Sequence, residues 1–255
     1  MSDGLTARLK SSLEQRVDCS AVLTAPLATL TAKELAQRTV DLERDGRVPL
    51  GELFEIKGSP AGRIRFTGDL SRADRLAAGL SEGAVTVEGN LGDEAGLGMA
   101  AGALVIEGNA GARTGAAAPG FRRGMTGGEL IVQGSAGAEA GASMRRGMLA
   151  IGGRAGDRAG LGMIAGNIVV FGTAGENAGL WSKRGSIAAL GGITPPASYA
   201  YACTYQPIHL RVMLLRLQTL YGIRVRKRQL AGLYRRYSGD LAELGKGEIL
   251  EWMAT

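Results

Sequence analysis

Short apolar triplets recur along the middle of the chain, and each ends two residues before a glycine. They are Val85–Val87, Leu104–Ile106, Leu130–Val132, Leu149–Ile151, Ile168–Val170 and Ile187–Ala189. In a strand, alternate side chains point to opposite faces, so the first and third members of each triplet share a face. The pattern predicts six short strands whose first and third residues line up as two interior ladders.

The glycines that follow the triplets set the period of the repeat. These markers, Gly89, Gly108, Gly134, Gly153, Gly172 and Gly191, are spaced by 19, 26, 19, 19 and 19 residues, so that one repeat carries a seven-residue insertion. Further glycines recur three and seven residues after the first five markers. A fixed period of this length is the signature of a solenoid in which each repeat stacks on its neighbours.

The contents of the repeat predict a coil of parallel strands. Alanine and other small residues follow each marker, and glycine permits the sharp corners between short strands. Glycine at this density opposes a helical repeat by about 1 kcal/mol for each residue. A left-handed hexapeptide coil is the alternative, but its turns have about eighteen residues and it needs aliphatic hexads. We therefore predict a mainly β fold, a right-handed parallel β-helix with 19-residue turns.

The flanks of the repeat predict a division into three parts. Residues 1–60 form a mixed N-terminal cap, in which Thr31 and Glu34 resemble a capping box ahead of a short helix. Residues 61–194 form the coil, with an irregular first turn through Ile64–Gly68. Residues 195–255 form a partly helical C-terminal tail, with leucine and methionine at helical spacing at Leu210, Met213, Leu214, Leu217 and Leu220. This helix is expected to pack on the coil or to close its end, with docking onto another protein as the alternative.

Composition narrows the class of protein. The 255 residues include two cysteines without a CxxC pair, which predicts neither a metal site nor a disulfide framework. The sequence has no apolar run near the ~20 residues of a membrane helix and begins without a secretory signal, so we expect a cytoplasmic protein with no membrane partner. His209 is the single histidine, and GxGxxxG at Gly96–Gly102 belongs to the repeat. We therefore predict no catalytic residue and no metal ligand in this chain.

The net charge of the chain is +6, and several of its basic residues are clustered along the sequence. The candidate binding residues are Arg122, Arg123, Arg145, Arg146, Lys183 and Arg184. The pairs Arg145-Arg146 and Lys183-Arg184 occupy equivalent positions in the repeat, two turns apart, and Ile164-Ala165 occupies this position in the turn between them. The cluster is either solvated charge or a surface that binds carboxylates of an acidic subunit or polyanionic ligand. Nucleic acid is disfavoured because no aromatic residues are interleaved with the charge.

The repeat resembles a known family. Gly-Asn-x-Gly-x-x-x-Gly, at Gly89–Gly96 and again from Gly108, is similar to the repeat of the C-terminal domain of the glutamate synthase large chain, a right-handed parallel β-helix. A free-standing chain of this length, with Leu50-Gly51-Glu52-Leu53-Phe54 ahead of the repeats, resembles the C subunit of formylmethanofuran dehydrogenase. The resemblance covers about residues 45–200.

This resemblance implies a non-catalytic scaffold. Such subunits occur in tungsten or molybdenum formylmethanofuran dehydrogenases and in bacterial formyltransferase/hydrolase complexes. The latter transfer a formyl group from tetrahydromethanopterin to a furan-type carrier of the methanofuran or methylofuran kind and release formate. The expected partners are the amidohydrolase-like A, the B and the formyltransferase-like D subunits. The arginine- and alanine-rich composition favours the bacterial complex, with the dehydrogenase as the alternative. Two other hypotheses are a β-helical binder of a polyglutamate carrier through the arginine column and an independent enzyme.

Overall fold

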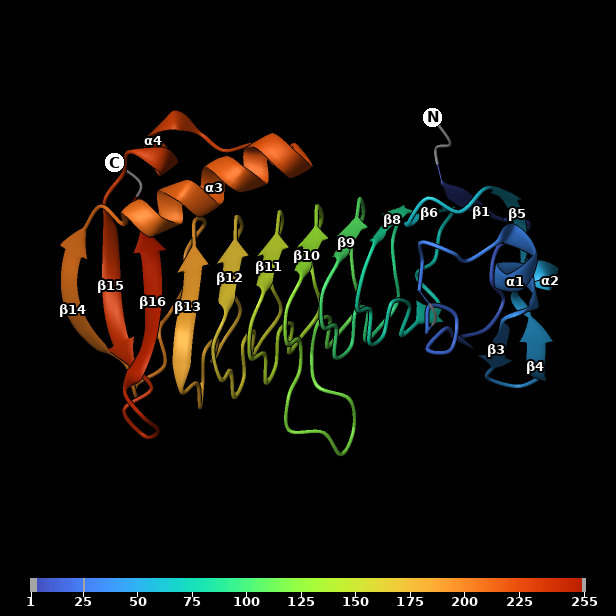
Figure 1. Ribbon diagram of the computed structural model, residues 1–255. Coiled ribbons are helices and arrows are strands. Elements are labelled where there is room, and N and C mark those ends of the chain that lie inside the picture. The colour runs from blue at the N-terminus through green and yellow to red at the C-terminus, as the bar shows by residue number, and fades with distance from the viewer. Residues whose placement is uncertain (1–3, 25, 254–255) are drawn as a thin grey trace.

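The computed structural model describes residues 4–24 and 26–253, and a twelve-stranded, mostly parallel sheet runs through it (Figure 1). The strands in its centre follow one another in chain order. They are β6 (Arg63–Thr67), β8 (Ala84–Glu88), β9 (Ala103–Ile106), β10 (Glu129–Val132), β11 (Met148–Ile151), β12 (Asn167–Val170) and β13 (Arg184–Ala189). All six predicted strands are therefore present at the predicted places.

Neighbouring central strands pair in parallel with the register that the glycine spacing predicts. Leu104 is the partner of Leu130, Leu130 of Leu149, and Leu149 of Ile168. These side chains are buried, as are those two positions later in each strand. The two predicted interior ladders are confirmed.

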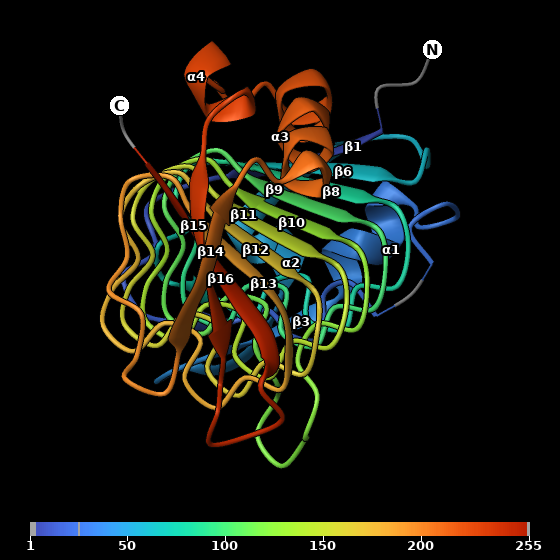
Figure 2. The same cartoon turned by 90° about the vertical axis from the view of Figure 1, so that its left-hand side faces the viewer.

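A second column of parallel pairing links the turns after their first corner. Single bridges join Leu91 to Ala110, Ala110 to Ala136, Ala136 to Ala155 and Ala155 to Ala174. Seen along the stack, the chain returns to the large sheet after each circuit (Figure 2). The corners need glycine: Gly160 has a φ of 71°, and a Cβ on Gly152 would lie 2.2 Å from the carbonyl oxygen of Gln133.

The N-terminal segment extends the large sheet and adds a small one. Strand β1 (Leu5–Leu9) lies parallel to β6 and antiparallel to β5 (Phe54–Gly58). The small sheet contains β2 (Val17–Asp18), β3 (Thr39–Leu42), β4 (Gly46–Pro49) and β7 (Ala73–Asp74). The predicted capping box of Thr31 and Glu34 begins α1 (Ala32–Gln37). A helical turn, α2 (Leu50–Leu53), stands between β4 and β5.

The C-terminal segment is partly helical, and it also contains three strands that the sequence did not predict. It contains α3 (Ile208–Tyr221) and α4 (Lys227–Leu230), together with the strands β14 (Ala200–Tyr205), β15 (Tyr234–Gly239) and β16 (Lys246–Trp252). Strand β16 pairs in parallel with β13, and β15 and β14 continue the sheet antiparallel. The last turn of the coil would otherwise expose a row of unpaired backbone groups, and these strands cover it.

Helix α3 packs on the outer face of the large sheet, as the sequence predicted (Figure 1). Leu210, Leu214 and Leu217 are fully buried against a second hydrophobic cluster. That cluster includes the middle residues of four triplets, Ile131, Ala150, Val169 and Ala188. Leu220 differs from the prediction because it is 55% exposed, since its side chain lies beside the buried stripe and not within it. No helix in the described part of the chain is long and apolar enough to cross a membrane.

Candidate functional site

Four of the six predicted basic residues lie in two adjacent columns of the stack, whereas Arg122 and Arg123 lie on the insertion loop. The backbone N–H of Arg145 donates to the carbonyl of Met125, that of Ile164 to Met144, and that of Lys183 to Met163. Arg145, Ile164 and Lys183 therefore occupy successive turns at one corner. Arg146, Ala165 and Arg184 follow them in the next column.

Four of the six basic residues line one groove. A cavity of about 660 Å³ is lined by Arg122, Arg123, Arg145 and Lys183, with Trp181 on its wall. Arg146 and Arg184 are exposed but do not line it. We call this cavity the basic groove.

The cations of the basic groove are available for an external anion. None of the four makes an ion pair within residues 4–24 and 26–253, and Glu243 is the single carboxylate in the lining. Arg145 is half-buried and the other three are exposed. Guanidinium groups held on a rigid coil can bind carboxylates through paired hydrogen bonds.

The seven-residue insertion forms a loop beside the basic groove. It projects from the coil between β9 and β10 (Figure 1). Phe121, on this loop, is 73% exposed, although phenylalanine is usually buried. A second cavity, of about 610 Å³, lies under the loop and is lined mainly by apolar residues, including Leu97, Ala118 and Phe121. Arg123 lines both cavities, so an apolar groove and a basic groove adjoin.

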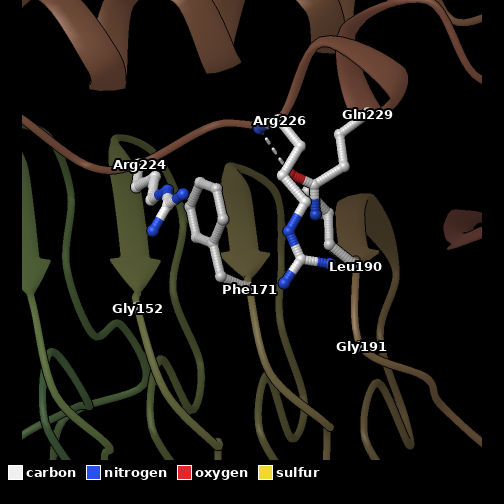
Figure 3. Close-up of a pocket in the computed structure, with 7 residues that line it drawn as sticks. All are labelled: Gly152, Phe171, Leu190, Gly191, Arg224, Arg226 and Gln229. Atoms are coloured by element: carbon white, nitrogen blue, oxygen red, sulfur yellow. Dashed lines mark hydrogen bonds between the residues drawn. The ribbon is translucent and has the colours of Figure 1, made fainter.

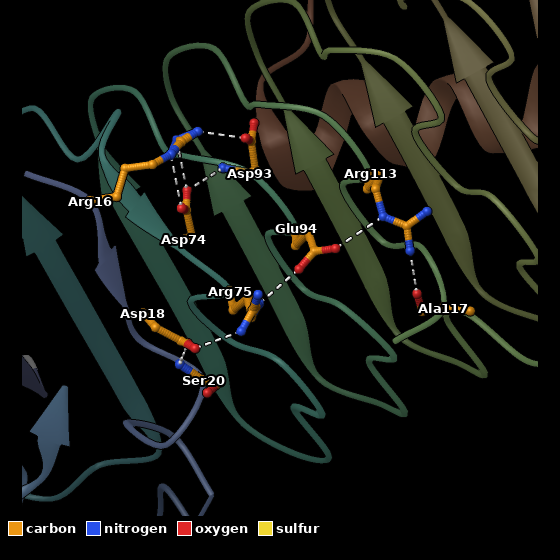
Figure 4. A network of polar contacts seen from close by, with 9 residues as sticks. All are labelled: Arg16, Asp18, Ser20, Asp74, Arg75, Asp93, Glu94, Arg113 and Ala117. Carbon is orange, nitrogen blue, oxygen red and sulfur yellow. Dashed lines mark hydrogen bonds and ion pairs between the residues drawn. The ribbon is translucent and has the colours of Figure 1, made fainter. Parts of the chain in front are cut away.

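A ladder of ion pairs crosses the turns on another corner (Figure 4). Glu94 accepts hydrogen bonds from Arg75 at 2.8 Å and from Arg113 at 3.0 Å. Arg113 also contacts Glu139 at 3.1 Å, and Glu139 contacts Arg158 at 2.9 Å. The side-chain charges of the ladder therefore alternate in sign from each turn to the next.

The ladder holds the carboxylate of Glu94 ionised. Burial opposes the charge on Glu94, but the hydrogen bonds from Arg75 and Arg113 outweigh it and lower the pKa of that carboxyl. The side chain of Glu94 is only 14% exposed, because the two arginines cover it. The sequence contains a signal for this ladder, because each of its members from Glu94 to Arg158 lies five residues after a marker glycine.

Side chains also hydrogen-bond to the backbone of the next turn near this ladder. Oδ1 of Asp74 accepts from the N–H of Asp93 at 2.8 Å, and Oδ1 of Asp93 accepts from that of Ala112 at 2.8 Å. Arg16 of the N-terminal segment contacts both carboxylates. Burial raises the pKa of Asp74, against the opposing effects of the N–H of Asp93 and of Arg16. These contacts tie the first turns together, so the ladder is a structural feature.

The remaining reactive groups do not converge. His209 lies on α3 with its Nε2 3.6 Å from Glu248, which also binds Arg236 and accepts from Ser186. Among the residues that the structure describes, no group of three or more His, Cys, Asp or Glu side chains could hold a metal ion. Cys19 is buried, and burial raises the pKa of its thiol to about 12.

Helix α3 carries a second apolar stripe on the side opposite the sheet. Ile208, Val212 and Leu215 are 75%, 62% and 40% exposed. Their spacing of four and three residues places them on one face of the helix. This face, which we call the outer stripe of α3, is not covered by any part of the described chain.

The comparisons with known proteins agree with one another. No protein-family model matches the chain. The C subunit of the formyltransferase/hydrolase complex Fhc of Methylorubrum extorquens is 35% identical over 87 residues, which are 34% of this chain and 32% of that protein. The match thus spans about a third of the length of that curated relative.

The structural likeness extends over the whole chain. A chain in the crystal structure of the formyltransferase/hydrolase complex FhcABCD from Methylorubrum extorquens, solved in complex with methylofuran, superposes with a TM-score of 0.77 and 32% sequence identity. The superposition covers 98% of this chain and 100% of that one. Together with the relative of known subunit type, it shows that this chain belongs to the family of the C subunits of formyltransferase/hydrolase complexes.

Proposed function

We propose that this chain is the scaffold of a formyltransferase/hydrolase complex and that it contributes no catalytic residue. It would hold the A, B and D subunits in place while they transfer a formyl group from tetrahydromethanopterin to a furan-type carrier and release formate. Kinship with the C subunit of Fhc supports this role. The proposal includes a cytoplasmic location. A tungsten or molybdenum formylmethanofuran dehydrogenase is the alternative assembly, which the comparisons do not favour.

We infer that residues 61–194 form a right-handed parallel β-helix between an N-terminal cap, residues 1–60, and a C-terminal tail, residues 195–255. The parallel register of β8 to β13 and the second column of bridges support the coil. A stack of this kind has little conformational freedom to lose when it binds other subunits, which suits a scaffold.

The outer stripe of α3 is the observation that carries the scaffold role. Three large apolar side chains exposed along one helix face are typical of a surface that another protein covers. Because α3 is anchored by Leu210, Leu214 and Leu217, it presents the stripe rigidly. The stripe therefore supports contact with another protein on this side of the sheet.

Co-purification tests this role. A tagged chain expressed in its own host is expected to bring down amidohydrolase-like and formyltransferase-like subunits. Val212→Asp, which places a charge in the outer stripe, is expected to weaken recovery of a partner protein by about tenfold or more. Gln218→Asp, on another face of α3, adds the same charge and serves as the control. Normal assembly of the Val212 variant, or recovery of the chain alone, would contradict the proposal.

A second candidate function is binding of an acidic carrier in the basic groove. Its support is the convergence of Arg122, Arg123, Arg145 and Lys183 without ion pairs among the described residues, beside an apolar groove that reaches Phe121. A furan-type carrier with a polyglutamate tail has carboxylates for the basic groove and a ring for its apolar neighbour. In this reading the scaffold also holds the tail of the carrier.

The two basic columns supply a matched test of the carrier hypothesis. Arg145→Gln with Lys183→Gln removes two charges from the groove, whereas Arg146→Gln with Arg184→Gln removes two charges outside it. Affinity of the intact complex for an oligoglutamate peptide is expected to fall about tenfold or more in the first pair only. Equal affinities in both pairs would remove this hypothesis.

The third hypothesis, an independent enzyme, predicts turnover by the purified chain alone. We expect none with formylated carriers, because the reactive side chains of the described residues do not converge on a common site. Turnover that survives removal of every other subunit would reverse this conclusion.

A further inference from the structure

A second cationic cavity, which shares no lining residue with the basic groove, lies under the segment that joins α3 to α4 (Figure 3). The stretch from residue 207 to residue 231 contains Arg211, Arg216, Arg224, Arg226, Lys227 and Arg228 and no carboxylate. The rest of the chain has 24 basic and 24 acidic residues, so this stretch accounts for the whole net charge of +6. Such a concentration of charge points to an anionic ligand or surface.

Two of these arginines face a cavity of about 380 Å³. Its floor is formed where β11, β12 and β13 end, at Gly152, Phe171 and Leu190, and its roof by Arg224 and Arg226. In Figure 3 the ring of Phe171 stands between the two guanidinium groups. Neither arginine makes a side-chain hydrogen bond or ion pair with another described residue. The cavity is in the size range of ligand pockets, about 300–1,000 Å³.

A buried amide gives this cavity an uncharged donor. Gln229 is only 6% exposed, and its Oε1 accepts the backbone N–H of Arg226 at 2.8 Å. Its Nε2 makes no hydrogen bond to any described residue and points into the cavity (Figure 3). This amide nitrogen is therefore free to donate a hydrogen bond to an acceptor that enters the cavity.

We propose that this cavity binds a small organic anion whose carboxylate or phosphate is held by Arg224, Arg226 and the Nε2 of Gln229. The arginines supply paired charge-assisted hydrogen bonds to the oxygen atoms, and the amide adds a third donor. Phe171 and Leu190 provide an apolar wall for a planar part of the same ligand. The site is separate from the proposed carrier groove and does not depend on the scaffold role.

Titration of the full chain with benzoate and phenyl phosphate at low ionic strength tests the proposal, with acetate and inorganic phosphate as probes that lack the planar part. Each planar anion is expected to bind at one site and more tightly than its small counterpart. Arg224→Gln and Arg226→Gln should each weaken binding about tenfold or more, through loss of charge-assisted hydrogen bonds. Arg211→Gln removes an exposed charge from α3 outside the cavity and should leave affinity unchanged.

Gln229→Glu is the sharpest variant. It keeps the oxygen that accepts from Arg226 and introduces a carboxylate beside Arg226, so benzoate binding should be lost while the fold persists. Retained affinity in this variant, equal weakening by Arg211→Gln, or no saturable binding to the wild type would overturn the proposal. Titration of the assembled complex identifies the source of the anion. Loss of benzoate binding there assigns the site to an acidic side chain of another protein in the complex, and retained binding assigns it to a soluble anion.

Discussion

Replacing Glu94 by glutamine tests whether the ion-pair ladder stabilises the coil. Glutamine has nearly the same volume, but it removes the charge that Arg75 and Arg113 share. One of its two terminal atoms is an NH₂ group, which would face a guanidinium donor. The substitution therefore breaks one hydrogen bond and weakens the other, with little change in packing.

The size of the effect follows from the exposure of the partners. A hydrogen bond to a charged group contributes about 1.5–3 kcal/mol when it is shielded from water. Arg75 and Arg113 are 43% and 35% exposed and keep other carboxylate partners, so the lower end of this range applies. We expect a loss of about 2 kcal/mol in the free energy of unfolding and a fall in Tm of roughly 4–8 °C for a chain of this size.

Denaturant unfolding followed by circular dichroism measures this loss. Glu82→Gln, at an exposed position without an ion partner among the described residues, is the control and should change stability by less than about 0.5 kcal/mol. High salt should narrow the gap between the two variants because it screens the ladder. A loss at Glu94 no larger than that at Glu82 would refute the view that the ladder is stabilising.

The same variant has a defined pH dependence. The folded state lowers the pKa of Glu94, so its contribution is present above the pKa of the unfolded chain, about 4.3, and is lost as pH falls through the folded value. The stabilities of the wild type and the glutamine variant should therefore converge below about pH 4. A gap that stays constant down to pH 3 would show that the charge of Glu94 is not the cause.

Three further outcomes are expected. Leu149→Ala, in the fully buried ladder, should cost about 2–5 kcal/mol in denaturant unfolding, whereas Leu220→Ala should cost less than about 0.5 kcal/mol; similar losses would contradict the assigned faces. Glu129→Gln removes the charge and one of the two oxygens that accept from Arg216 and Tyr221, and it should speed amide hydrogen exchange in α3 but not in β8; unchanged exchange would argue against anchoring by Glu129. Native chain should react with one equivalent of iodoacetamide, at exposed Cys203, and with a second only after unfolding exposes Cys19; two fast equivalents would contradict its burial.

The sequence predicted the stacked parallel strands of the large sheet because its signals are local and repeated. Glycine at each corner and period-two alternation in each triplet are independent of distant contacts, so the register of Leu104, Leu130 and Leu149 could be read directly. The pairing of strand β16 could not be predicted in this way, because β16 joins the sheet only after the chain has passed through α3, and it lies outside the nineteen-residue period. Its pairing is decided by the open edge of β13, which is a tertiary property.

The residues of the two candidate binding sites were predicted only in part. Arg145 and Lys183 were correctly placed in one column, since stacking preserves sequence offset. The sequence did not separate them from Arg146 and Arg184, because adjacent residues at a corner diverge in direction. The cavity of Arg224, Arg226 and Gln229 was beyond sequence reasoning, since its floor comes from the coil and its roof from the segment after α3.

The alternating charges of the ladder fix how the coil can change length. Excising the circuit that carries Glu94 would leave every glycine corner intact, yet it would set Arg75 directly against Arg113 at a spacing of about 4.8 Å. Removing two circuits would restore opposite neighbours. We therefore expect circuits within the ladder to be gained or lost in pairs. The backbones of the circuits are nearly equivalent, but the charge that each circuit carries makes neighbouring circuits different.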